Sequence, residues 1–479
     1  MLAHWVLEEM KTADLNDQRL NARLNTLLDQ LAARPTASIP AACGGCAEMT
    51  AAYRFFNNGK ATYEKIMQPH LEATRQRMAE QPVVLLVQDT TELDLTRPEK
   101  QVEGVGLLDG NARRGLLSHV LHAFTSDGTP LGTVHSEPWT RDENAVASSS
   151  LSRAERAAMP IEQKESYRWV EAMQRAQEEA RRAPATTFVC VGDSEADIYE
   201  LFAQGAAEPQ LRWLVRACQN RALQPGEETA EKYVRQQVLS TPVLFTQKIK
   251  VRGRTAKVAC ETRGRRQPRK SRETEVAVRA TSVTLRPPWR ADRTLPAVTV
   301  NVIAVTEVNP PADDEPIEWI LITTLPITDI EQVREIIQYY VVRWTIEIFF
   351  RVLKGGCRVE RRKFEHIDRL LSCLAIYMIV AWRTLFVCRM GRSCPDIDCE
   401  AIFDPAEWKS VWKVVKRTAP PRTPPRLQEM VRMIAQLGGY VNRQRDDPPG
   451  PQTVWLGLQR MHDMALCWKL FGPDSRQDE

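Results

Sequence analysis

The sequence predicts an α/β protein with a mixed sheet, a β-rich insertion, and a helical module at each end of the chain. Short apolar runs typical of buried strands alternate with helical patterns between about residues 83 and 216. From about residue 225 to residue 325 the pattern changes to successive β segments. In the first 75 or so residues, and again in the tail beyond residue 425, apolar residues recur at helical spacing.

The composition is that of a soluble globular protein, because 43% of the 479 residues are hydrophobic and 26% are charged. This length is too great for one ordinary domain. No apolar run reaches the 18 residues of a membrane span, and the N-terminus lacks the pattern of a signal peptide. We therefore expect a cytoplasmic protein, of bacterial origin, with no membrane partner.

The 11 cysteines are scattered and odd in number, which suits reduced thiols. Only Cys43 and Cys46 form a C-x-x-C pair, and no second pair of zinc ligands lies nearby. Plain thiols are therefore favoured over a zinc site. The sequence assigns no role to this pair or to the cysteines at 388–399.

The net charge of +4 is too small to indicate a nucleic-acid partner by itself. Its distribution is more informative, because eleven Lys or Arg residues and only three Glu lie between Lys248 and Glu275. Such a block either meets a polyanion or forms a solvated loop tip, and the sequence does not decide between the two.

Residues 1–75 are expected to form a helical domain. Leucines at helical spacing predict one helix between residues 20 and 31, and a second helix follows over 49–56. Arginines on these helices would suit a small DNA-contacting module, although an ordinary helical subdomain is the alternative. The candidate contacts are Arg19, Arg23 and Arg54.

Residues 76–220 are expected to form the first part of a catalytic core. Three strands, a helix, a strand, a helix and a strand follow one another, which is the order of an RNase H-like mixed core. The strands are expected at 83–87, 118–125, 131–135, 187–191 and 211–216, and the helices at 160–182 and from Ala196.

The rest of the chain divides into three further parts. Residues 221–325 form the β-rich insertion, and residues 326–390 complete the core with a long helix over 330–353 and an apolar helix over 367–388. Four prolines between residues 418 and 425 predict a linker within the C-terminal helical module, 391–479.

Two aspartates stand where predicted strands end. Asp89 comes directly after the strand over 83–87, and Asp193 comes just after the strand over 187–191. Ligand sites in open α/β sheets gather at the carboxyl ends of strands, so these carboxylates could converge. Either aspartate alone is more often a turn residue or a helix N-cap.

The long helix carries a polar stripe in an otherwise apolar pattern. Tyr340, Arg343, Glu347 and Lys354 have offsets of 0, 3, 7 and 14, which at about 100° per residue fall within an arc of about 60°. Such a stripe is costly unless it meets partners, and phosphates and metal ions are such partners. An exposed, salt-bridged face is the alternative.

These residue types suit phosphodiester chemistry. Three carboxylates can hold two Mg²⁺ ions about 3.5–4 Å apart, which stabilise the attacking and the leaving oxygen. Arg343 and Lys354 would then grip neighbouring phosphates.

Other chemistries lack their motifs. His119 and His122 are the only histidines close together, and their odd offset on a strand directs them to opposite faces. The chain has no H-E-x-x-H, no G-x-S-x-G, no Walker motif and no G-x-G-x-x-G after a strand, so no nucleotide cofactor is expected.

The stripe Tyr340-x-x-Arg343-x-x-x-Glu347-x-x-x-x-x-x-Lys354 resembles the YREK signature of the insertion-sequence-four family of DDE transposases, and within it the transposon-five type. The resemblance runs nearly end to end. Its other motifs are Asp17-x-Arg19-Leu20-x-x-Arg23-Leu24, Ala52-Tyr53-Arg54-Phe55-Phe56-Asn57-Asn58, Asp89-Thr90-Thr91, Asp193-x-Glu195-Ala196-Asp197-Ile198, Leu437-Gly438-Gly439-Tyr440 and Trp455-x-Gly457-Leu458-Gln459-Arg460.

The resemblance implies a role for each matched residue. Asp89, Asp193 and Glu347 would be the catalytic triad that binds metal, with two Mg²⁺ ions for which Mn²⁺ can substitute. Tyr340, Arg343, Lys354 and Arg216 would hold DNA phosphates near the cut. Trp319 would stack on a flipped base; a core aromatic on a strand is the alternative.

The resemblance also implies cut-and-paste transposition through nicking, hairpin formation and strand transfer. Partners would be double-stranded DNA, as transposon ends and target, and a second copy of the chain through the C-terminal module. Residues 1–75 would bind the DNA end, and bound protein would associate with the nucleoid. Two alternatives stay open: a non-catalytic DNA-binding inhibitor or domesticated derivative, and a related nuclease that cuts but never joins.

Overall fold

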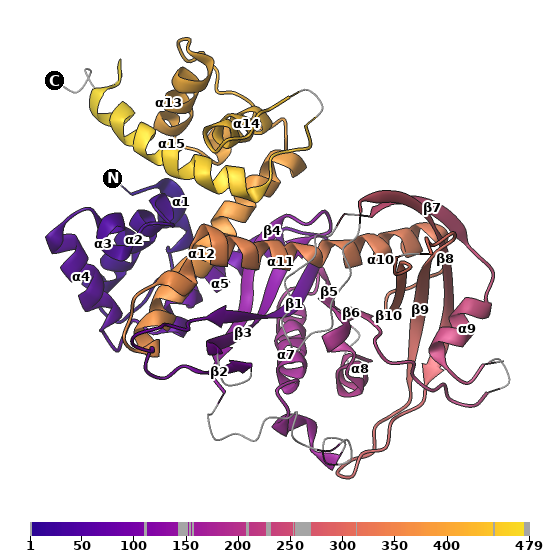
Figure 1. Ribbon diagram of the computed structural model, residues 1–479. Helices are drawn as coiled ribbons and strands as arrows, with labels where there is room; N and C mark the ends of the chain where they lie inside the picture. The colour runs from indigo at the N-terminus through magenta and orange to yellow at the C-terminus, as the bar shows by residue number, and fades with distance from the viewer. Residues whose placement is uncertain are drawn as a thin grey trace. The chain divides into compact units, whose positions relative to one another are not determined.

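The computed structural model describes residues 2–109, 113–141, 152, 155, 158–206, 210–226, 231–251, 253, 270–312, 314–443 and 446–473. It divides into two compact units, Met1–Val146 with Trp344–Glu479, and Ala147–Arg343. Figure 1 labels their helices and strands. Most of the expected basic block, including Arg263, Arg265, Arg266 and Arg269, lies outside the described residues.

The first unit begins with five helices, which confirms the helical prediction for this region. They are α1 (His4–Glu9), α2 (Gln18–Ala33), α3 (Ile39–Cys43), α4 (Cys46–Phe56) and α5 (Tyr63–Ala79). Asp17 caps α2, since its Oδ1 accepts a hydrogen bond from the Arg19 amide at 2.9 Å. The leucines that predicted this helix are fully buried.

The strands of the first unit pair antiparallel in the order β2-β3-β1. Strand β4 also pairs with β3, beyond the short β2 pairing and on the edge away from β1. The strands are β1 (Val83–Asp94), β2 (Gly106–Asp109), β3 (Arg113–Thr125) and β4 (Pro130–Trp139). The prediction that β1 ends before Asp89 is wrong: Asp89 lies inside the strand, opposite Val120. Pairing with β3 continues through the polar residues, because the branched threonines 90 and 91 suit a pleated strand.

The first unit is completed by helices from the C-terminal part of the chain. They are α11 (Trp344–Arg351), α12 (Ile367–Ser393), α13 (Pro405–Lys416), α14 (Leu427–Leu437) and α15 (Pro451–Phe471). The last three pack on the end of α12 around Trp408, Met430 and Ile434, all buried. Helix α12 is long and apolar enough to cross a membrane, even though it contains Arg383. However, 83% of its most apolar 18-residue stretch is buried inside the protein, as is usual for the core helix of a soluble protein.

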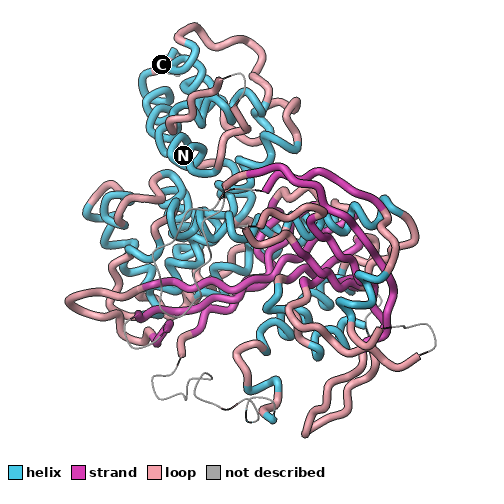
Figure 2. The backbone as a smooth tube through the Cα atoms, turned by 45° about the vertical axis from the view of Figure 1, so that its right-hand side comes forward, coloured by secondary structure: helices cyan, strands magenta, loops and turns pink. Residues whose placement is uncertain are grey.

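The second unit contains a mixed sheet in the order β5-β6-β10-β9-β8-β7. Strands are magenta and helices cyan in Figure 2. Strands β5 and β6 are parallel, and the other described pairs are antiparallel. The elements are α7 (Tyr167–Arg182), β5 (Thr187–Gly192), α8 (Tyr199–Ala206), β6 (Leu211–Arg216), α9 (Val234–Ser240), β7 (Phe245–Val251), β8 (Arg272–Leu285), β9 (Val298–Glu307), β10 (Glu318–Thr323) and α10 (Ile330–Val342). The α/β class and the mixed sheet are as predicted.

The single helix expected over 330–353 is two helices. A turn at Arg343 separates α10 from α11, and α11 passes into a π-helical turn over Val352–Gly356. A π turn carries more residues per turn than an α-helix. The arc of about 60° calculated for an α-helix therefore does not extend to Lys354.

Candidate active site

Asp193 follows β5 in the second unit and is partly exposed. Its Oδ1 accepts a hydrogen bond from the Glu195 amide at 2.8 Å and caps the 3₁₀ turn Ser194–Ala196. Asp193 thus has the capping role that the sequence offered as the alternative to a chemical one. It uses one carboxylate oxygen only, so it does not exclude a chemical role for the other.

Asp193 and three other candidate residues gather around Tyr340. The rings of Trp319 and Tyr340 meet edge to face with centroids 5.4 Å apart, and the Arg343 guanidinium lies 5.9 Å from the Tyr340 ring. Arg216, at the end of β6, forms a hydrogen bond with Tyr340. Strands β5, β6 and β10 and helix α10 thus bring together five of the predicted site residues.

The charges of this cluster act on Tyr340. Burial raises the pKa of its hydroxyl above the usual range, while the positive charges of Arg343 and Arg216 oppose that rise and the Asp193 carboxylate adds to it. Tyr340 is 1% exposed and Arg343 is 3% exposed, whereas Trp319 is half-buried. The tyrosine therefore remains a neutral hydrogen-bonding group at ordinary pH.

Asp89 and Glu347 both belong to the first unit. Asp89 is half-buried on β1, and its Oδ1 accepts the Thr90 amide at 2.8 Å. Glu347 is exposed in the first turn of α11, a helix that packs against β1 through a face that includes the buried Ile346, Phe349 and Phe350. The two carboxylates thus lie on neighbouring elements.

Lys354 lies in the π turn, and its surroundings were not foreseen from the sequence. Burial lowers the pKa of its ammonium, and the carboxylates of Glu360 and Glu92 oppose this. Arg113 bridges Glu92 at 2.9 Å and Asp94 at 3.1 Å. Glu92 and Asp94 are two residues apart, so on a strand they lie on the same face. This acidic pair was missed because the strand was predicted to end before Asp89.

The N-terminal candidates lie apart from these groups along the chain. Arg19 and Arg23 are on α2 and Arg54 is near the end of α4. The Arg19 side chain is 93% exposed, with Asp17 at 3.5 Å. Arg54 is also exposed, and Arg23 is half-buried.

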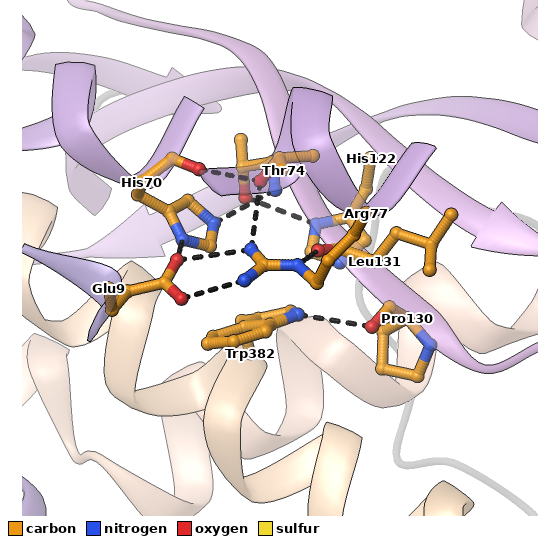
Figure 3. A network of polar contacts seen from close by, with 9 residues as sticks. Glu9, His70, Thr74, Arg77, His122, Pro130, Leu131 and Trp382 are labelled. Atoms are coloured by element: carbon orange, nitrogen blue, oxygen red, sulfur yellow. Dashed lines mark hydrogen bonds and ion pairs between the residues drawn. The ribbon is translucent and has the colours of Figure 1, made fainter. Parts of the chain in front are cut away.

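A buried polar network, which the sequence did not indicate, joins α1 to the sheet of the first unit (Figure 3). Glu9 of α1 pairs with His70 and, at 2.8 and 3.1 Å, with both terminal nitrogens of Arg77; both residues are on α5. Arg77 Nε donates to the Leu131 carbonyl of β4 at 2.6 Å, and its guanidinium lies 4.2 Å from the Trp382 ring of α12.

The network fixes the tautomer of His70. The Thr133 amide donates to His70 Nε2 at 3.0 Å, so Nε2 must be unprotonated and the proton is on Nδ1, directed at Glu9. Burial lowers the pKa of His70, although Glu9 opposes the shift, in agreement with a neutral ring. Glu9 keeps a lowered pKa because His70 and Arg77 outweigh the effect of its burial.

Three family profiles match the chain. Residues 2–61 match a transposase DNA-binding domain, residues 170–381 a transposase DDE domain, and residues 379–467 a transposase Tn5 dimerisation domain. Together they cover about three quarters of the sequence, in the order expected from the motifs. The chain belongs to the Tn5-like DDE transposases. Its mixed sheet and covering helices are the α/β RNase H-like core of that family, with helical flanks.

Among solved structures, the chain is similar to a piggyBac transposase in a synaptic complex with hairpin DNA, at 9% identity and a TM-score of 0.35. The similarity covers 87% of this chain but only 59% of that one. At this level it carries no argument about function.

Membership of the DDE family implies the use of a divalent metal. In the described part of the chain, no group of three His, Cys, Asp or Glu side chains is arranged to hold an ion. Asp89 and Glu347 belong to one unit and Asp193 to the other. The donor set itself fits, because carboxylate oxygens are the ligands that Mg²⁺ and Mn²⁺ prefer. Convergence of the triad stays a prediction.

Proposed function

We propose that this chain is an active DNA transposase that excises and inserts DNA by cut-and-paste transposition. The observation that carries the proposal is the cluster of Trp319, Arg343, Arg216 and Asp193 around Tyr340. Two guanidiniums, a neutral phenol and an aromatic ring beside a carboxylate suit a phosphodiester and its base better than they suit the protein interior.

In this proposal Asp89, Asp193 and Glu347 hold two Mg²⁺ ions, or Mn²⁺ in their place. When bound, the metal activates water and stabilises the charge that develops on the transferred phosphate. Arg343, Arg216 and Lys354 bind the neighbouring phosphates, with Tyr340 as a neutral hydrogen-bonding partner. The half-buried Trp319 offers its ring to a flipped base beside the cut.

The reaction sequence has four steps. Water cleaves one strand at the element's end and leaves a 3′-hydroxyl. That hydroxyl attacks the opposite strand, so that one phosphodiester forms as another breaks and a hairpin closes the end. Water reopens the hairpin and frees the 3′-hydroxyl again. That hydroxyl finally attacks a phosphodiester of target DNA, so that the new bond forms as the target strand breaks and releases its own 3′-hydroxyl. The partners are transposon ends, target DNA and a second copy of the chain, and the matched DNA-binding and dimerisation segments support this set.

The test is incubation of the full chain with Mg²⁺ and linear DNA that carries the element's own ends, followed by denaturing gels. We expect nicks and hairpins, and their loss in Asp89→Asn, Asp193→Asn and Glu347→Gln proteins that still bind the ends. Glu365→Gln is the matched control, because that carboxylate is exposed in an ion pair with Lys100. It should cut like the natural chain.

The other outcomes identify the alternatives. Specific binding of ends without cutting, in either Mg²⁺ or Mn²⁺, would contradict the proposal and favour a non-catalytic DNA-binding protein. Hydrolysed ends that are never joined to target DNA would indicate a nuclease. Loss of end binding in Glu347→Gln would give this residue a structural role.

A further inference from the structure

The C-terminal module separates its charges along the chain. The 18 residues from Lys409 to Arg426 contain six cations and no carboxylate. The segment just before them, residues 396–407, contains five acidic residues and no cation. A surface that serves solubility alone gains from mixed signs, so a block of one sign calls for a specific explanation.

The cations of this basic segment are displayed together. Lys409, Lys413 and Lys416 have offsets of 0, 4 and 7 on α13, an arc of about 60°. Arg417 ends the helix in the left-handed conformation, with φ 59°. The loop that carries Arg422 contains four prolines. Proline restricts the backbone, so less conformational entropy is lost when such a loop binds a partner.

The loop is also attached to the helix it leaves. Trp412 Nε1 donates to the Thr418 hydroxyl at 3.2 Å, and the Lys416 ammonium lies 5.2 Å from the Trp412 ring. At its far end, the Leu427 amide donates to the Ile397 carbonyl at 2.8 Å. The basic segment is therefore preorganised at both ends.

Three of these cations have no acidic partner within the part of the chain that the structure describes. Lys413, Arg417 and Arg422 are exposed, and none of them is in an ion pair with another residue of the described ranges. Lys416 pairs with Glu429 and Arg426 with Asp396, each at 2.6 Å, but both pairs are open to solvent and can exchange partners.

Helix stability explains only part of this arrangement. Cations in the last turn of a helix are stabilised by the negative end of the helix dipole, and this accounts for Lys413 and Lys416. Arg422 and Arg426 lie beyond the helix end, where that effect has decayed. A second, polyanionic partner accounts for all of them.

We propose that the basic segment Lys409–Arg426 is a binding surface for the phosphate backbone of duplex DNA, independent of base sequence. The inference rests on the proposed function, which supplies the DNA, and it gives the segment matched to a dimerisation domain a second role. Exposed lysines bind phosphates as point charges, and exposed arginines bind them through two N–H groups at once. Such contacts to the phosphate backbone do not depend on the base sequence.

The test is the salt dependence of binding to a duplex of about 30 base pairs that lacks the element's ends. Each phosphate contact contributes about 0.9 to the slope of log K against log salt. Lys413→Gln/Arg417→Gln/Arg422→Gln should lower the slope by about 2.7. Between 50 and 200 mM salt the natural chain should then lose about 40-fold more affinity than the variant does.

Two controls make the result specific to charge and to place. Arg417→Lys/Arg422→Lys keeps both charges and should keep the slope. Arg443→Gln/Lys469→Gln removes two exposed cations elsewhere in the same module and should leave the slope within error of the natural chain. Thermal melting and sedimentation of each variant show that its fold and its self-association persist.

The outcomes separate this inference from the proposed function. An unchanged slope in the triple Gln variant overturns the inference, even where the natural chain still cuts its ends. An equal loss in the off-segment control also overturns it. A natural chain that binds neither this duplex nor its own ends contradicts the proposed function itself. Joining to target DNA should fall in the triple variant while cutting of ends persists.

Discussion

Glu9→Gln tests the buried network of Figure 3 most directly, because one oxygen-to-nitrogen change removes the negative charge that His70 and Arg77 both contact. The Glu9 side chain is 4% exposed and the Arg77 side chain is 23% exposed. The substitution keeps the shape of the side chain but removes its charge. The Arg77 guanidinium then keeps its Leu131 carbonyl, Thr74 hydroxyl and Trp382 ring partners but loses the opposite charge of Glu9.

The replacement amide cannot accept from all three donors, which are His70 Nδ1 and the two terminal nitrogens of Arg77. His70 must donate from Nδ1, since its Nε2 already accepts from the Thr133 amide, and Arg77 can only donate. A glutamine has one acceptor oxygen, so its NH₂ group faces a donor on whichever side it lies. Removing one partner of a buried ion pair costs about 3–5 kcal/mol.

We therefore expect Glu9→Gln to lower the free energy of unfolding of the first unit by about 3–5 kcal/mol. Urea unfolding of the full chain, followed by far-ultraviolet circular dichroism, measures this change. Glu365→Gln, in the exposed pair with Lys100, should change it by about 0–1 kcal/mol. A loss in Glu9→Gln no larger than that of the control would refute the reasoning. The network would then be a neutral set of contacts.

Three further predictions concern pH, the base-stacking ring and the N-terminal domain. Burial holds the pKa of His70 below its ordinary 6.5, so the stabilisation from its neutral form is present above 6.5 and is lost as pH falls below that value. Unfolding between pH 7.5 and 5 should show less pH dependence in His70→Gln, and an identical slope would mean that His70 titrates normally. Trp319→Ala should let nicks accumulate at the expense of hairpins on a denaturing gel, since base–aromatic stacking contributes about 1–3 kcal/mol; equal loss of every product would make Trp319 a core residue. Deletion of residues 2–61 should abolish preference for the element's ends in competition binding, and a surviving preference would move end recognition elsewhere.

The sequence predicted best those strands that contain an unbroken run of buried residues. The bounds of β6 were predicted to the residue and those of β5 to within one, because residues 213–215 of β6 and residues 188–192 of β5 are buried in succession. Strand β1 was predicted too short for the opposite reason. Beyond Gln88 its residues are mostly half-buried and polar, and only pairing with β3 identifies them as strand.

The break at Arg343 was not predictable from periodicity. Apolar residues recur at helical spacing on both sides of it, and the backbone at Arg343 keeps right-handed helical angles, with φ −47° and ψ −38°. Nor could the network around Glu9 be predicted, since its members come from four elements far apart in the chain. Each is an ordinary polar residue by itself, and only tertiary packing makes it a buried one.

Asp193 shows how a structural and a chemical reading of one residue can both hold. The capping hydrogen bond to the Glu195 amide needs an oxygen acceptor, and asparagine supplies one as well as aspartate does. Metal binding and the electrostatic effect on Tyr340 need the negative charge instead. Asp193→Asn therefore separates the two: a stable protein that no longer cuts has lost only the charge, whereas a destabilised one has lost the turn. Asp193→Ala would remove both at once, which is why the conservative substitution is the informative one.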